Sequence, residues 1–425
     1  LNDPNMHARY QPGVNSRAFL RRVCEVDYIT GATPCIHGDE TVISAVSAGK
    51  DWRIEDIRGW TPTGCVEPSL PGKSVSATSS LEVNLVAPFE MALNNGTHPL
   101  MQWDLGPKTG SIENGDFSNF EDFQNAFTKQ CEFLFEQTVI GNNQLGAVHQ
   151  HHLPAPLMSS LFDGCIEKGR GYTRGGATYN SSGVSLTGLT DVVDSLMAIK
   201  KLVYDEKRVT FPELKKAMDS NFVGYEKLHA MIKSRVPRFG SGNQEALDMA
   251  NWVTGMVNGY YRNQKNYRGG AYTTGWWSMN YHTAYGRVAG ASASGRLDGE
   301  PFTPGLTPHP AASTNMLDNL LDVAQLDPKT IDNNIAFNVR IVPSSKDTHE
   351  QTVERMTNYV ETFIKKGGMQ VQFNVVDTDT LKDAMAHPEA YPDLLVRVSG
   401  YCGYFTKLHR DLQLEIIRRC EYGLD

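Results

Sequence analysis

The C-terminal part of the chain alternates between strand and helix patterns, and this alternation constrains the fold more than any other feature. In order, the patterns are a strand at 335–342, a helix at 348–365, a strand at 369–376, a short helix at 381–385 and a strand at 394–398. Alternating strands and helices with short connections are typical of α/β proteins. Because such strands need cover on both faces, we expect them to form part of a closed barrel surrounded by helices.

Three further helices are predicted upstream of this region. The pair Ser118 and Glu121 fits a capping box that begins a long amphipathic helix, and Thr210 with Glu213 begins another. A third helix is predicted where apolar residues recur every four positions, at Leu81, Leu85, Phe89 and Leu93. No internal repeat or low-complexity linker marks a domain boundary in between.

The composition indicates a large folded body. Hydrophobic residues make up 40% of the 425 residues and aromatic residues 9%, which excludes intrinsic disorder. No segment approaches the roughly 20 consecutive apolar residues of a membrane helix, and the best stretch, 81–93, is interrupted by Glu82 and Glu90. The net charge is −8 and both signs are mixed along the chain. We therefore expect neither a membrane nor a nucleic-acid partner.

The seven cysteines are scattered, and no two of them form a C-x-x-C pair. This usage is typical of reduced thiols in a cytosolic protein. The first residues, 1–4, contain neither Met nor the charged and apolar segments of a signal peptide. We expect a cytoplasmic protein, of which this chain begins in the middle.

The first candidate site is the segment Gly-Cys-Val-Glu-Pro at 64–68. Cys65 and Glu67 lie two residues apart between Gly and Pro, so a tight loop can present a thiol and a carboxylate to one cavity. The alternative is an ordinary turn with a buried cysteine and a solvated glutamate. The residues alone leave both interpretations open.

The second candidate is Gly400, which interrupts an apolar strand pattern at 394–405. A glycine at this place can simply mark a bulge or a strand end. It also has a chemical property that no other residue shares. A radical on its Cα has no side chain to force it out of plane, and the flanking amides delocalise it. A thiol is its natural partner, since S–H and glycyl C–H bonds are similar enough in strength for reversible hydrogen exchange.

Histidines provide two weaker candidates. His98 lies in a loop between Gly96 and Pro99, where it is either an active-site group or a polar residue satisfied by its neighbours. A cluster at 149–152 contains three histidines, but no Asp, Glu or Cys stands nearby at ligand spacing. We expect no metal site at this cluster.

Together and in this order, the Cys65 and Gly400 motifs resemble the glycyl radical enzymes of the pyruvate formate-lyase-like superfamily. Blocks between them also resemble these enzymes, at 163–180, 194–207 and 292–308. The resemblance extends over essentially the whole chain. It rests on a cysteine motif, GCVEP, and a glycine motif, RVSGY at 397–401, that are both highly specific.

The resemblance implies an α/β barrel of ten strands in which a cysteine loop and a glycine loop meet. Such enzymes are roughly twice as long, so the chain would be a C-terminal half, with a barrel portion at 1–380 and a glycine radical domain at 381–425. The implied cofactor is a glycyl radical on Gly400, with no metal in this chain. An S-adenosylmethionine-dependent iron–sulfur activase would install the radical. The enzyme would act on a small molecule as a homodimer, with or without a small iron–sulfur subunit.

Within the superfamily, the chain most resembles the arylacetate decarboxylases, which act on 4-hydroxyphenylacetate or indoleacetate. Pyruvate formate-lyase itself pairs two adjacent cysteines, unlike the Cys65 motif. Diol dehydratases place an acidic ligand, and fumarate-adding enzymes an arginine, about fourteen residues after the cysteine, and 77–80 contains neither. His98 lies 33 residues after Cys65, where the decarboxylases place a histidine.

The implied reaction converts an arylacetate to a methylarene and carbon dioxide. The Gly400 radical would take hydrogen from Cys65, and the Cys65 thiyl would react with the substrate and finally return hydrogen. Glu67 would act as acid and base, and His98 would orient the ring or move a proton. The alternative is a glycyl radical lyase for C–O, C–N or C–S bonds, of the diol dehydratase, choline or isethionate lyase type. A cysteine hydrolase that uses Cys65 and His98 is also compatible with the residue types, and so is a non-catalytic structural fragment.

Overall fold

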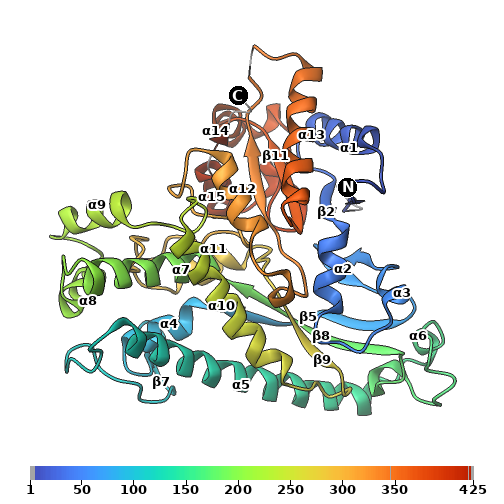
Figure 1. Ribbon diagram of the computed structural model, residues 1–425, viewed down its shortest axis with the longest axis horizontal. Coiled ribbons are helices and arrows are strands. Elements are labelled where there is room, and N and C mark those ends of the chain that lie inside the picture. Colours follow the sequence, from blue (N-terminus) through green and yellow to red (C-terminus); the bar gives the residue numbers. More distant parts are fainter. Residues whose placement is uncertain (1–4, 345, 420, 423–425) are drawn as a thin grey trace.

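The computed structural model describes residues 5–344, 346–419 and 421–422, in which helices surround strands in an α/β fold (Figure 1). The predicted class is confirmed. None of the described helices is both long and apolar enough to cross a bilayer. Two features of the sequence, the first four residues and Cys420, lie outside the described residues.

Two sheets carry the fold. The larger sheet has the order β1-β2-β11-β10-β14 and is parallel except where β11 meets β2, whereas the smaller sheet, β5-β8-β9, is entirely parallel. A parallel bridge between Trp276 and Ile335 connects them. The described strands do not close into a barrel. Their bounds are His7–Tyr10 (β1), Cys35–Gly38 (β2), Ser74–Asn84 (β5), Tyr179–Thr187 (β8), Ala271–Gly275 (β9), Asn338–Ile341 (β10), Gln370–Val375 (β11) and Glu421–Tyr422 (β14).

Three short antiparallel hairpins project from this framework, and two of them carry the candidate site. They are β3 (Thr61–Thr63) with β4 (Glu67–Ser69), β6 (Thr97–His98) with β7 (Trp103–Asp104), and β12 (Leu395–Arg397) with β13 (Cys402–Tyr404).

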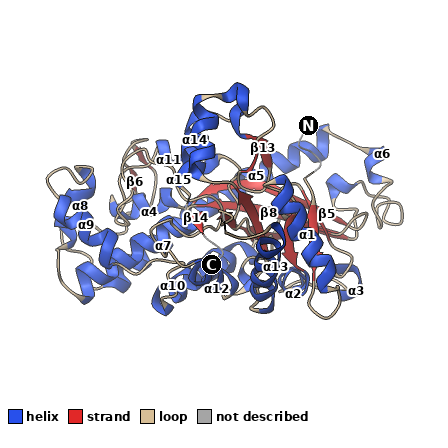
Figure 2. Ribbon diagram, turned by 90° about the horizontal axis from the view of Figure 1, so that it is seen from above, coloured by secondary structure: helices blue, strands red, loops and turns tan. Residues whose placement is uncertain are grey.

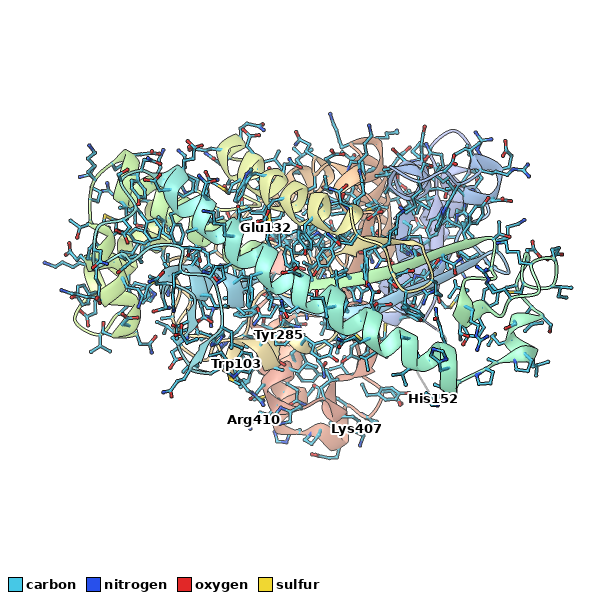
Figure 3. The ribbon with its side chains drawn as sticks, turned by 90° about the horizontal axis from the view of Figure 1, so that it is seen from below. Trp103, Glu132, His152, Tyr285, Lys407 and Arg410 are labelled. Atoms are coloured by element: carbon cyan, nitrogen blue, oxygen red, sulfur yellow. The ribbon has the colours of Figure 1, made fainter. Side chains whose placement is uncertain are left out.

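Helices cover the outer faces of both sheets. The long helix α5 (Phe120–His152) crosses the smaller sheet from below (Figure 3), and Tyr272 of β9 donates to Asn142 of this helix at 3.0 Å. Helices α1 (Arg17–Thr30) and α13 (His349–Lys365) pack side by side beside the larger sheet (Figure 1). The other α-helices are Asp39–Ser47 (α2), Ile54–Ile57 (α3), Val86–Leu93 (α4), Pro156–Ser159 (α6), Leu189–Ala198 (α7), Phe211–Asp219 (α8), Glu226–Arg235 (α9), Gln244–Arg262 (α10), Tyr281–Arg287 (α11), Met316–Ala324 (α12), Thr378–Ala386 (α14) and Arg410–Arg418 (α15).

The C-terminal segment has a hydrophobic core of its own. Its buried residues form a C-terminal cluster that is separate from the main core: Val376, Leu381, Ala384, Val396, Val398, Phe405, Leu412 and Ile416. This segment, with α14, α15 and the β12–β13 hairpin, stands to one side of the sheets when the molecule is seen from above (Figure 2).

Most of the elements predicted in the sequence are present. Thr348 caps α13 by accepting from the backbone of Gln351, and Thr210 caps α8 by accepting from Glu213. The long helix α5 begins one residue later than its predicted box, because the capping pair is Asn119 with Asp122. The strand predicted at 394–398 is β12, which pairs antiparallel with β13 and not with a parallel neighbour.

The helix predicted from Leu81 onwards is wrong in its first part. Residues up to Asn84 belong to β5, and α4 begins only at Val86. In β5 the apolar residues Leu81 and Val83 alternate with polar ones and face the main core from a strand. The apolar residues spaced four apart from Leu81 to Phe89 therefore belong to two different elements, a strand and a helix.

Candidate active site

Cys65 lies at the tip of the β3–β4 hairpin. Gly64 makes the turn with φ +60°, a left-handed conformation that favours glycine. An added Cβ on Gly64 would come within 3.0 Å of Glu67 Oε1, so the carboxyl group folds back over the turn. Cys65 packs against a small apolar group that contains Trp277 and Ala336.

The Glu67 carboxyl group is buried, and the residue is only 2% exposed. Its Oε2 accepts from the Val66 backbone at 2.6 Å, and its Oε1 accepts from the hydroxyls of Thr78 at 3.1 Å and Ser79 at 3.3 Å. Burial raises the pKa of Glu67, although these donors counteract the effect. The interpretation of Glu67 as a solvated turn residue is therefore wrong.

The Cys65 thiol is held in its protonated form. Burial raises its pKa to about 12, and the nearby charge of Glu67 adds to the shift. A nucleophilic cysteine must ionise to a thiolate, and this environment opposes ionisation. A thiol that keeps its hydrogen is suited to hydrogen-atom exchange.

Gly400 lies in the turn between β12 and β13, directly against Cys65. Its φ is +97°, and an added Cβ would lie 2.4 Å from Cys65 Cβ and 3.1 Å from Cys65 Sγ. The two residues that the sequence motifs singled out are 335 positions apart and are brought into contact by the fold. The Gly400 Cα thus faces the Cys65 side chain.

One side chain that the sequence did not indicate, Asn5, bonds to both loops. The Asn5 amide donates to the backbone oxygens of Gly400 at 2.7 Å and Cys65 at 3.3 Å. Arg397, which is fully buried, donates to the same Gly400 oxygen at 2.9 Å and to Gln372 Oε1 at 2.9 Å. Arg397 belongs to the glycine motif, but Asn5 and Gln372 belong to no recognisable pattern.

His98 lies in β6, and its polar contacts among the described residues do not involve the two loops. Its Nε2 is 3.4 Å from Glu90 Oε2, and its Nδ1 accepts from the Met101 backbone at 3.2 Å. Burial lowers the pKa of His98. None of these contacts reaches Cys65 or Gly400, so Cys65 and His98 do not form the pair that a cysteine hydrolase would need.

The histidines at 149–152 are exposed at the end of α5, where His152 is labelled in Figure 3. A different group of possible metal ligands was missed in the sequence: His7, Cys35 and His37 place one donor atom each within 4.8 Å of the others. Burial lowers the pKa of His7 to about 4, so its ring is neutral. However, Arg397 donates to Cys35 Sγ at 2.9 Å, and its positive charge opposes a cation there. The alternation Cys35-x-His37 on a strand could have indicated two of the three residues.

Two family models match the chain. The model described as "Pyruvate formate lyase-like" matches residues 1–286, and the model described as "Glycine radical" matches residues 302–406. The second match includes Gly400, and the first includes Cys65 and Glu67.

Individual proteins similar to this chain include a trans-4-hydroxy-L-proline dehydratase of Clostridioides difficile, which is 33% identical over 95% of the chain and 50% of its own length. An indoleacetate decarboxylase of Tractidigestivibacter scatoligenes is 29% identical over 87% of the chain and 44% of its own length. The glycerol-bound structure of the B12-independent glycerol dehydratase from Clostridium butyricum matches with a TM-score of 0.94 at 30% identity, covering 100% of this chain and 53% of that one. The chain thus spans about half the length of these relatives.

Proposed function

Because the chain belongs to the pyruvate formate lyase-like family and contains a glycine radical domain, we propose that it is the catalytic part of a glycyl radical lyase that eliminates a leaving group from a small polar substrate. The single observation that carries the proposal is the close approach of Gly400 to Cys65, where a Cβ added to Gly400 would lie 3.1 Å from the Cys65 sulfur. The buried Glu67 carboxyl two residues further on supplies the acid–base group that an elimination needs.

The reaction would begin after an S-adenosylmethionine-dependent iron–sulfur activase has removed one hydrogen atom from the Gly400 Cα. Cys65 then gives its hydrogen atom to Gly400 and takes one from the substrate carbon next to the leaving group. Glu67 takes a proton from the substrate and gives one to the departing hydroxyl, so that water leaves. Cys65 finally returns its hydrogen atom to the product radical and regains the hydrogen that Gly400 holds.

Dehydration is supported over decarboxylation by two observations. The dehydratase relatives are more similar to the chain than the decarboxylase relative is. In addition, His98, on which the decarboxylase prediction depended, contacts Glu90. The alternative is decarboxylation of an arylacetate, and the experiment has to distinguish it from elimination. A catalytic role of His98 is part of this alternative.

The test is anaerobic activation of the full-length polypeptide that contains these residues, followed by a panel of substrates. The panel contains trans-4-hydroxy-L-proline, propane-1,2-diol, isethionate and 4-hydroxyphenylacetate. We expect a glycyl doublet in the electron paramagnetic resonance spectrum and elimination from at least one of the first three. Release of carbon dioxide from the arylacetate alone would favour the decarboxylase, and absence of the doublet would refute both.

Glu67→Gln is expected to keep the Gly400 radical and to lower turnover by about 10²–10⁴-fold, the usual contribution of a positioned acid or base. Gln fits the site, because its carbonyl oxygen can accept from Val66 and its amide can donate to the hydroxyls of Thr78 and Ser79. The measurement is the steady-state rate at equal radical content. A Gln variant with the unsubstituted rate would remove Glu67 from the mechanism.

Exposure of the activated protein to oxygen is expected to cut the backbone at Gly400, because oxygen adds to a carbon radical on the main chain. The C-terminal fragment would contain about 25 residues, counted from Tyr401 to Asp425. Mass spectrometry before and after exposure to air measures the fragment. Protein that was never activated should stay intact, and an uncut activated protein would contradict the position of the radical.

A further inference from the structure

Glu82 of β5 is a carboxylate that has no role in the proposed mechanism. Its neighbour Val83 faces the main core, and successive residues of a strand point to opposite faces, so Glu82 points away from that core. Across the strand pair it lies opposite Ser185 of β8. The Ser185 hydroxyl donates to the backbone oxygen of Trp277, which packs against Cys65. Glu82 therefore faces the same side of the sheet as the cysteine loop.

The carboxyl group of Glu82 has no hydrogen-bond partner among the described residues. The residue is partly exposed as a whole, but both of its carboxylate oxygens are buried. The hydroxyl of Ser185 lies nearby, but it already donates to Trp277 at 2.7 Å. No described Lys, Arg or His forms an ion pair with Glu82 either. Burying a carboxylate without a partner is unfavourable, so packing of this chain alone does not explain its position.

The groups around Glu82 would attract a positive charge. Burial, with a smaller contribution from the Glu67 carboxylate, raises the pKa of Glu82 to about 7, although the nearby Ser185 hydroxyl opposes the shift. Glu82 in turn raises the pKa of Cys65, and it adds to the burial that raises the pKa of Tyr285 to about 12. Tyr285, on α11, lies between α5 and the C-terminal segment (Figure 3). Because both Glu82 oxygens are buried and unpaired among the described residues, and a second carboxyl group acts on them, a positive charge beside Glu82 would be stabilised.

We propose that Glu82 binds the protonated amino group of the substrate, so that the substrate is a small hydroxylated amine or amino acid. The inference rests on the proposed function and narrows its substrate class. Glu82 holds the cationic end of the molecule, while Cys65 and Glu67 act on the carbon atoms that carry the leaving group. A neutral diol lacks the charge that the pair of carboxylates selects.

The test uses the full-length polypeptide with Glu82→Gln, which keeps the size of the side chain and removes its charge. Binding of trans-4-hydroxy-L-proline is measured by calorimetry on protein that has not been activated, and KM is measured after activation, with propane-1,2-diol as the neutral probe. We expect Kd and KM for the amine to rise by at least about 10-fold. Values for the diol should change by less than about 3-fold.

A matched control is Asp322→Asn on α12, which also converts a buried carboxylate to an amide but lies outside the site. It should leave both Kd and KM unchanged. Equal changes for amine and diol with Glu82→Gln, or no change for either, would overturn the inference. A Glu82→Gln protein with lower thermal stability but an unchanged Kd would also overturn it, because Glu82 would then have a structural partner within the protein. A wild type that forms the doublet and turns over only the diol overturns this inference alone, whereas absence of the doublet overturns the proposed function.

Discussion

Gly400→Ala is expected to abolish both the glycyl doublet and turnover. A Cβ would force the radical centre out of the plane in which the flanking amides delocalise it. The structure adds a second effect, because the Cβ would come 2.4 Å from Cys65 Cβ and Gly400 has φ +97°. A left-handed conformation costs a residue with a side chain about 1–2 kcal/mol, so the variant should also be somewhat less stable than the unsubstituted protein.

Gly403→Ala provides the matched control for this strain. Gly403 lies in the same hairpin, its φ is not left-handed, and an added Cβ would meet only the end of the Leu408 side chain at 3.1 Å. Spin resonance, turnover and thermal unfolding are measured on both variants. The Gly403 variant should retain the doublet. A folded Gly400→Ala protein with full turnover would show that the reaction does not use a glycyl radical.

Cys65→Ser is expected to retain the Gly400 radical and to reduce turnover below detection. The serine hydroxyl has nearly the same size, so the hairpin should fold normally. Its O–H bond is, however, too strong for reversible exchange with a glycyl C–H bond, and the radical cannot reach the substrate. The readouts are the amplitude of the doublet and product formation after anaerobic activation.

Cys402→Ser tests whether any thiol close to the radical could take this role. Cys402 lies two residues after Gly400, but its Sγ donates to the Ala32 backbone oxygen at 3.2 Å. A serine hydroxyl can make the same bond, so this variant should keep both the doublet and turnover. Activity in the Cys65 variant combined with its loss in the Cys402 variant would reassign the thiyl radical.

The meeting of Cys65 and Gly400 was predicted through the resemblance to the glycyl radical enzymes, which depends on two short motifs that can be recognised in the sequence. Gly64 and Gly400 have left-handed backbones, which glycine adopts most easily, and each stands inside a distinctive short motif. Helix α13 was equally predictable, because its apolar stripe, its Thr348 cap and the glycines after its end all indicate the same helix.

The remaining parts of the site depend on contacts that only the fold creates. Asn5 reaches Gly400 across nearly the whole length of the chain, and no local pattern distinguishes it from other asparagines. Glu82 was visible only as an interruption of an apolar stretch. Its meaning depends on the pairing of β5 with β8, whose register shifts between Ala77 and Leu81. This register shift determines the face of β5 on which Glu82 lies, and that face cannot be found by counting residues from Cys65.

The separate hydrophobic core of the C-terminal segment has a consequence for the proposed mechanism. Gly400 belongs to a hairpin whose apolar residues, Val396 and Val398, are buried in the C-terminal cluster, whereas Cys65 packs on the other side against Trp277. The boundary between the two hydrophobic cores therefore passes between Gly400 and Cys65, the two residues that exchange hydrogen in the proposed mechanism. If the two hydrophobic cores separated along this boundary, each would keep its own packing, and Gly400 would lose its contact with the Cys65 thiol. In the proposed mechanism the two cores would therefore have to stay together for hydrogen to pass between Cys65 and Gly400, and Asn5 donates to the backbone oxygens of both residues.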